Sequence, residues 1–191
     1  MSCYHPIDCW RVHDASTKSG FRIVFGSPTV PPERGAEPCT IPCGKCIGCR
    51  LAHSRQWAVR CVHEASLHDR NCFLTLTFDD AHLPASRSVN VRDVQLFLKR
   101  LRKALSYQNI KIRFFACGEY GDKNERPHYH LIIFGYDFAD DRVLLRNTPY
   151  GPLYISDFLF GLWPYGFHTI GSVSFHSCVL MSHDNSDQES L

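Results

Sequence analysis

The chain has 191 residues, 44% of them hydrophobic, which is enough for one domain to bury a sizeable core. We find no signal peptide and no apolar run long enough to span a bilayer, so we expect neither a secreted nor a membrane protein. All 21 basic residues lie at or before Arg146, where the net charge is +6, and the remainder carries −4. A basic body that could meet a polyanion therefore precedes an acidic tail, although solvated surface charge would give the same balance.

A short strand is predicted at Phe21–Phe25, ahead of a cysteine-rich stretch. The clustering of several of the ten cysteines favours reduced thiols in a cytosol over a secreted disulfide scaffold. Short spacers, two of them with glycine where the chain must turn, suit a structural zinc site made by Cys39, Cys43, Cys46 and Cys49. Either Cys3 or Cys9 could replace one ligand, and free thiols or an iron-sulfur cluster are the alternatives.

Two amphipathic helices are expected next, at Arg50–His68 and at Val91–Leu105, with a half-buried strand at Phe73–Phe78 between them. Asn90 has the side chain of a helix N-cap. One face of the second helix is apolar, and the other carries four basic residues: Lys99, Arg100, Arg102 and Lys103. This basic face is a candidate DNA contact, and a solvated helix face is an equally good explanation.

The most informative stretch is Arg126–Gly135, where His128 and His130 are separated by one residue on a predicted strand. Residues i and i+2 of a strand point to the same face, so both imidazoles could bind one ion. If the preceding strand pairs Glu119 opposite His128, a carboxylate joins them. Two neutral imidazoles and one carboxylate suit a catalytic divalent cation and phosphate chemistry. A lone His-x-His pair is a weak motif, but here an apolar run follows it and a third ligand is near.

After this hairpin we expect a short helix capped by Ser156 that ends at Trp163, and a closing strand over Gly166–Phe175. The predicted fold class is α+β: an antiparallel sheet of about five strands with helices on one face, plus a small N-terminal Cys-rich module. The open face of the sheet would hold the metal and the DNA. The predicted divisions are 1–50 for the N-terminal strand, loop and zinc module, 51–175 for the metal-bearing domain and 176–191 for a polar tail.

Several motifs occur in one order along the chain: the Cys39–Cys49 cluster, Arg50–Cys61, Phe73–Asp80, Cys117-Gly-Glu-Tyr-Gly121 and Arg126-Pro-His-Tyr-His130. Together they resemble the replication initiators of microviruses, particularly the gokushovirus branch, which are His-hydrophobe-His (HUH) endonucleases of rolling-circle replication. The resemblance runs from about Cys39 to Phe175, and several ordered motifs are far more specific than any one of them.

The resemblance implies an endonuclease that nicks and rejoins single-stranded phage DNA at its origin, in the cytoplasm of a bacterial host and with host replication proteins. Mg²⁺ or Mn²⁺ bound by Glu119, His128 and His130 would polarise the scissile phosphate, and a tyrosine would attack it. Contacts with DNA are expected from the basic helix face and from Arg55 and Arg126.

The sequence departs from the resembled family after Phe175, where those proteins carry a pair of tyrosines one helical turn apart with a nearby lysine. No tyrosine follows Tyr165 here. Freely chosen codons for Leu180–Ser190 give parts of that motif in adjacent frames, so we expect a C-terminal truncation or a frameshift. Three functions stay open: a competent nickase, a non-cleaving metal- and DNA-binding remnant, and a transposase or relaxase of the same superfamily. A cupin-like oxygenase is disfavoured, because no glutamate follows His130 closely.

Overall fold

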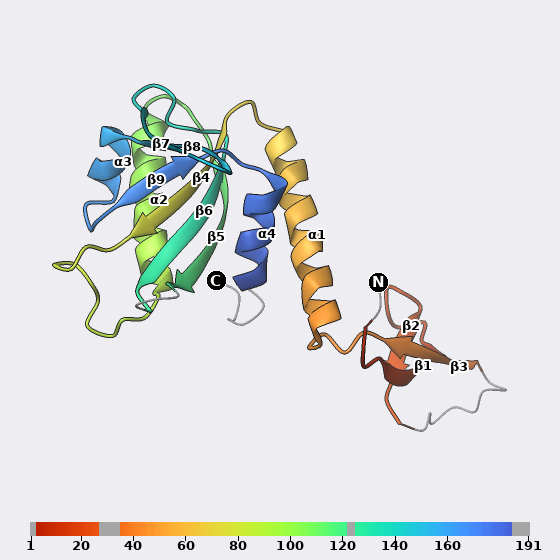
Figure 1. Ribbon diagram of the computed structural model, residues 1–191. Coiled ribbons are helices and arrows are strands. Elements are labelled where there is room, and N and C mark those ends of the chain that lie inside the picture. Colours follow the sequence, from red (N-terminus) through yellow and green to blue (C-terminus); the bar gives the residue numbers. More distant parts are fainter. Residues whose placement is uncertain (1–2, 27–34, 122–124, 185–191) are drawn as a thin grey trace. The chain divides into compact units, whose positions relative to one another are not determined.

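The computed structural model describes residues 3–26, 35–121 and 125–184, and the chain divides into two units, residues 1–53 and 54–191. In the first unit, an antiparallel sheet in the order β2-β1-β3 is formed by β1 (Ile7–His13), β2 (Phe21–Val24) and β3 (Ala36–Ile41). The predicted strand at Phe21–Phe25 is β2. α1 (Ile47–Ser66) begins in the first unit and continues into the second (Figure 1).

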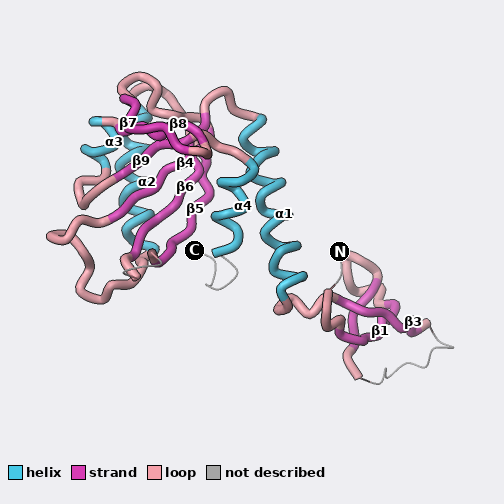
Figure 2. The backbone as a smooth tube through the Cα atoms, in the orientation of Figure 1, coloured by secondary structure: helices cyan, strands magenta, loops and turns pink. Residues whose placement is uncertain are grey.

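The second unit is built on a six-stranded antiparallel sheet in the order β5-β6-β4-β9-β8-β7 (Figure 2). Its strands are β4 (Asn71–Thr77), β5 (Arg113–Tyr120), β6 (Pro127–Phe134), β7 (Val143–Thr148), β8 (Gly151–Ile155) and β9 (His168–Gly171). Its remaining helices are α2 (Val91–Ser106), α3 (Asp157–Leu162) and α4 (Phe175–Asp184). The α+β class is confirmed. Among the described helices, none is both long and apolar enough to cross a membrane.

Helices lie on both faces of this sheet, whereas the sequence predicted them on one face only. Leu131 and Ile133 of β6 point into the core under α2, while Ile132 and Phe134 point into a second core with α1 and α4. The cause is the uninterrupted apolar run at the end of β6, because a strand that is apolar on both sides must be covered on both sides. The sheet also has six strands in place of about five.

The segment predicted as one closing strand over 166–175 is instead the short strand β9 followed by the start of α4. Ser174 and Ser177 explain the change, since each hydroxyl accepts a hydrogen bond from the other residue's backbone N–H, at 3.1 and 2.9 Å. This reciprocal pair has the geometry of a capping box and starts a helix. Of the predicted tail, only the part within α4 lies inside the described residues, and residues 185–191 lie outside them.

The other predicted elements form with small shifts at their ends. Asn90 caps α2 by accepting a hydrogen bond from the N–H of Arg92, and Ser156 caps α3 in the same way with Leu159. The five apolar residues of the α2 stripe are all buried: Val94, Phe97, Leu98, Leu101 and Leu105. The β7–β8 hairpin escapes sequence analysis because β7 is an almost fully exposed edge strand with no alternating pattern.

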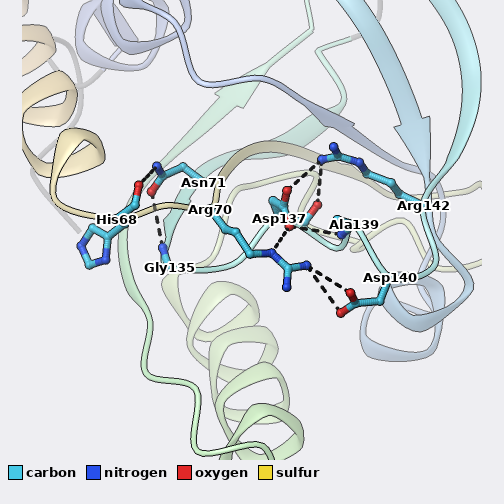
Figure 3. A network of polar contacts seen from close by, with 8 residues as sticks. All are labelled: His68, Arg70, Asn71, Gly135, Asp137, Ala139, Asp140 and Arg142. Atoms are coloured by element: carbon cyan, nitrogen blue, oxygen red, sulfur yellow. Dashed lines mark hydrogen bonds and ion pairs between the residues drawn. The ribbon is translucent and has the colours of Figure 1, made fainter.

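A polar network at one end of the sheet fixes how β4 pairs with β6 (Figure 3). Asn71 at the start of β4 accepts a hydrogen bond from the N–H of Gly135, just beyond β6. Beside it, the Nε of Arg70 lies 2.6 Å from an oxygen of Asp137, whose other oxygen is 3.3 Å from Arg142. Because Asp137 is half-buried between two guanidinium groups, this cluster holds the β6 end of the sheet against the start of β4.

The core under α2 gives a stability prediction. Leu131→Ala should lower the free energy of unfolding by about 2–5 kcal/mol, because Leu131 is fully buried and the substitution leaves a cavity. The matched control is Leu144→Ala on β7, where the leucine is 51% exposed and the expected change is below about 0.5 kcal/mol. Urea unfolding followed by circular dichroism measures both, and equal losses would contradict the placement of the core.

Candidate metal centre

The hairpin of β5 and β6 brings Glu119, His128 and His130 together in the arrangement predicted from the sequence. In the observed antiparallel register Glu119 lies opposite His128, and Cys117 lies opposite His130. Opposed residues of an antiparallel pair share a face, as do residues two apart on one strand. The three side chains therefore stand on one face, the face that also carries α1 and α4 at its β5 edge (Figure 1).

The donor atoms of the three side chains converge. The Nε2 atoms of His128 and His130 lie 3.1 and 2.9 Å from the same Glu119 oxygen, Oε2. All three ligand atoms lie within 4.8 Å of one another, and the side chains are 16–34% exposed. The site is thus shielded but open to solvent, as a substrate-binding metal site must be.

The second nitrogen of each imidazole is held from behind. Nδ1 of His128 donates a hydrogen bond to the carbonyl oxygen of Arg126 at 3.2 Å, and Nδ1 of His130 lies 3.1 Å from the hydroxyl of Thr75. A carbonyl oxygen only accepts, so a neutral His128 carries its proton on Nδ1 and turns the Nε2 lone pair toward Glu119. Two acceptors that face each other this closely need a proton or a cation between them. The donor set therefore fits a divalent cation.

Burial acts in the same direction at His130. Desolvation is the main cause that lowers the pKa of His130 below its usual value, and the neighbouring His128 adds to it. Lowering the pKa keeps the imidazole neutral at pH 7, which is the form that binds a metal ion. The nearby Phe73 ring stacks on His130 with centroids 5.3 Å apart, which further fixes the orientation of the imidazole.

The sequence did not reveal the outer partners of these histidines. Thr75 lies directly opposite His130 on β4, and Thr77 lies opposite His128. Leu74 and Leu76 are buried on the α2 side, so the threonines alternate onto the metal face, where Thr169 of β9 pairs with Thr75. The alternation was visible in the sequence, but the register that sets Thr75 beside His130 was not.

The predicted DNA-contact residues fall in different places. Arg55 is exposed on α1, and Lys99, Arg102 and Lys103 are exposed on α2. α2 covers the face of the sheet opposite the metal centre, so its basic residues do not border it. The guanidinium of Arg100 is turned inward and donates a hydrogen bond to the Tyr165 hydroxyl at 3.0 Å.

Arg126 is the predicted DNA-contact residue nearest to the centre. Its guanidinium binds Asp80 and the carbonyl of Phe78. The Asp80 side chain is 93% exposed, so this ion pair lies at the surface.

Four cysteines of the first unit also gather, but with one change from the predicted set. Cys43, Cys46 and Cys49 are joined by Cys3, and these four Sγ atoms lie within 4.8 Å of one another. Cys39 is not among them, because β3 pairs with β1 and sets Cys39 directly opposite Cys9, with their Sγ atoms 3.2 Å apart. The predicted ligand Cys39 is therefore replaced by Cys3.

Comparison with known proteins gives a consistent result. Residues 71–183 match the family model of the replication-associated protein ORF2. The chain is 38% identical over 187 residues to the replication-associated protein VP4 of Bdellovibrio phage phiMH2K, which covers 93% of this chain and 55% of that protein. It is 35% identical over 144 residues to the replication-associated protein ORF2 of Spiroplasma virus 4, which covers 72% of this chain and 45% of that protein.

A third relative is the replication-associated protein ORF4 of Chlamydia phage 1, 36% identical over 135 residues, or 66% of this chain and 33% of that protein. The chain thus spans between a third and about half of the length of these relatives. No solved structure matches it.

The converging donors predict the effect of removing one ligand. His128→Ala and, separately, Glu119→Gln should each weaken Mn²⁺ binding by more than about tenfold, since loss of an outer partner alone costs about 10–100-fold. Titration of Mn²⁺ with the free ion followed by electron paramagnetic resonance measures this. His63→Ala, at an exposed position on α1, is the matched control and should bind as the unaltered chain does. Unchanged Mn²⁺ affinity in H128A would refute the ligand assignment.

Proposed function

Because this chain belongs to the family of the replication-associated protein ORF2, we propose that it is the metal- and DNA-binding part of a rolling-circle replication initiator of a single-stranded DNA phage. The observation that supports the proposal best is the convergence of two imidazole nitrogens on one oxygen of Glu119. Sites of this composition serve phosphate chemistry, and the relatives are replication-associated proteins.

The chemistry follows from the charges of the ligands. A Mg²⁺ or Mn²⁺ ion held by Glu119, His128 and His130 would act as a Lewis acid toward a phosphate oxygen. Glu119 is the only anionic ligand of the three, so the loaded site keeps a net positive charge that attracts a phosphodiester. Arg126 and Thr75 hold the two imidazoles in place through their Nδ1 atoms, which limits the reorganisation needed when the phosphate binds.

The metal face offers a place for single-stranded DNA. Thr75, Thr77 and Thr169 line β4 and β9 beside the two histidines, and all three are partly exposed. On this face α4 packs against β5 and β6 through Cys178 and Met181 (Figure 1). A strand that crosses the threonines would therefore have the metal ligands and α4 along its path. Threonine hydroxyls are frequent donors to phosphate oxygens.

The tyrosines of the described chain do not supply an evident nucleophile. α4 contains none, although it lies on the metal face and immediately follows the last strand. Tyr154 and Tyr165 pack against the core on the α2 side. Tyr150, in the turn between β7 and β8, is 81% exposed and stacks on His176 in the first turn of α4. We therefore propose that this chain binds metal and origin DNA without cutting it.

The first test is incubation of the chain with labelled single-stranded origin DNA and Mn²⁺. We expect Mn²⁺ to tighten DNA binding, measured by fluorescence anisotropy, and we expect no covalent protein-DNA adduct on a denaturing gel. His128→Ala should remove the Mn²⁺-dependent gain, for which about tenfold corresponds to about 1.4 kcal/mol. His63→Ala, the exposed control on α1, should retain it.

Two outcomes would contradict the proposal in different ways. DNA binding that is insensitive to Mn²⁺ and to His128→Ala would separate DNA recognition from the metal centre. A covalent adduct would show a competent nickase, and peptide mapping should then begin with Tyr150, the most exposed of the three candidates, followed by Tyr154 and Tyr165.

A further inference from the structure

The first unit holds a second cluster of ligand atoms that the proposed DNA chemistry does not use. Cys3 comes from the segment before β1, Cys43 and Cys46 from the turns after β3, and Cys49 from the first turn of α1. All four cysteines are free, and their Sγ atoms lie within 4.8 Å of one another. Cys3 and Cys43 are 40 positions apart in the sequence, so this meeting is a product of the fold and not of local spacing.

The distances between the sulfur atoms match those around one tetrahedral ion. The Sγ atoms of Cys3 and Cys46 are 3.8 Å apart, and those of Cys43 and Cys49 are 4.0 Å apart. A Zn–S bond of about 2.3 Å implies tetrahedral S···S edges of about 3.8 Å. Disulfide sulfurs would be about 2.05 Å apart. An iron-sulfur cluster distributes its thiolates over several iron atoms, which places them farther apart than one ion does.

Backbone N–H groups are already directed at these sulfur atoms. The N–H of Cys43 donates to Sγ of Cys3 at 3.2 Å, and that of Cys46 donates to Sγ of Cys43 at 3.3 Å. The N–H of Tyr4 donates to Sγ of Cys46 at 3.4 Å. Such donors stabilise negative charge on sulfur and orient the ligands, as outer partners do in metal sites. Gly44 makes the turn between two ligands possible with its positive φ of 75°.

We propose that Cys3, Cys43, Cys46 and Cys49 bind one structural Zn²⁺ in a closed four-thiolate site that holds the segment before β1 to the start of α1. Binding converts four thiols to thiolates and releases their protons to solvent, with no change of oxidation state. Four thiolates fill a tetrahedral ion, so the site has no open position for a substrate. A unit of 53 residues that has a three-stranded sheet gains most of its order from such a link.

Cobalt substitution tests the ligand set. The full-length chain with His128→Ala is prepared metal-free under reducing conditions, so that the His–Glu centre does not contribute, and Co²⁺ is then added. We expect one Co²⁺ per chain, with the intense sulfur-to-cobalt charge-transfer absorption of four thiolates, and displacement by one equivalent of Zn²⁺. Cys3→Ser should weaken binding by more than about tenfold and reduce this absorption. Cys39→Ser, the matched control, should leave both unchanged.

Alkylation of the chain without cysteine substitutions provides a second readout that does not depend on how a variant folds. With Zn²⁺ present, Cys3, Cys43, Cys46 and Cys49 should be protected from iodoacetamide and Cys39 should react, and a chelator should expose all four. Protection of Cys39 in place of Cys3 would overturn the ligand set. Absence of metal-dependent protection, or a brown chain that contains iron and inorganic sulfide, would overturn the zinc site. Neither result bears on Mn²⁺ at His128.

Discussion

The register between β5 and β6 is the constraint on which the metal centre depends. Glu119 opposite His128 is the pairing that joins a carboxylate to two imidazoles. A slip of one residue would carry the histidines to the opposite face, under α2, and would leave Glu119 with apolar neighbours. The register is protected because the end of β6 is packed on both faces, and because the cluster around Asp137 fixes its exit from the sheet. Stability at one end of the strand thus secures chemistry at the other.

β6 therefore divides into two halves with different tasks. Its first half, from Pro127 to His130, alternates between the core and the half-open metal face. Its second half, Leu131–Phe134, is buried throughout and joins the two cores. The boundary between them sets the environment of His130, which is shielded enough for desolvation to keep its pKa low and open enough for an ion to enter. The centre is a consequence of where the helix cover on that face ends.

Sequence reasoning succeeded where the determinants are local and failed where they are distant. The pairing of Glu119 with His128 follows from a short loop and two adjacent strands, so periodicity sufficed. Cys3 was not preferred over Cys39, because the choice depends on β1 pairing with β3 across 30 residues. The start of α4 was read as strand, since its capping pair is formed by Ser174 and Ser177 without the usual Glu or Gln. Helices on both faces were foreshadowed only by the unbroken apolar run of β6.

The hold on His128 by a carbonyl has a consequence for how the protein can diverge. Every amino acid carries a carbonyl oxygen, so substitution of Arg126 need not disturb the tautomer of His128. Position 126 is therefore free to drift as the DNA target changes. Position 75 has no such freedom, because the group beside His130 is a side-chain hydroxyl that only serine could replace at similar size. Two equivalent supports of one centre thus leave very different room for evolutionary change.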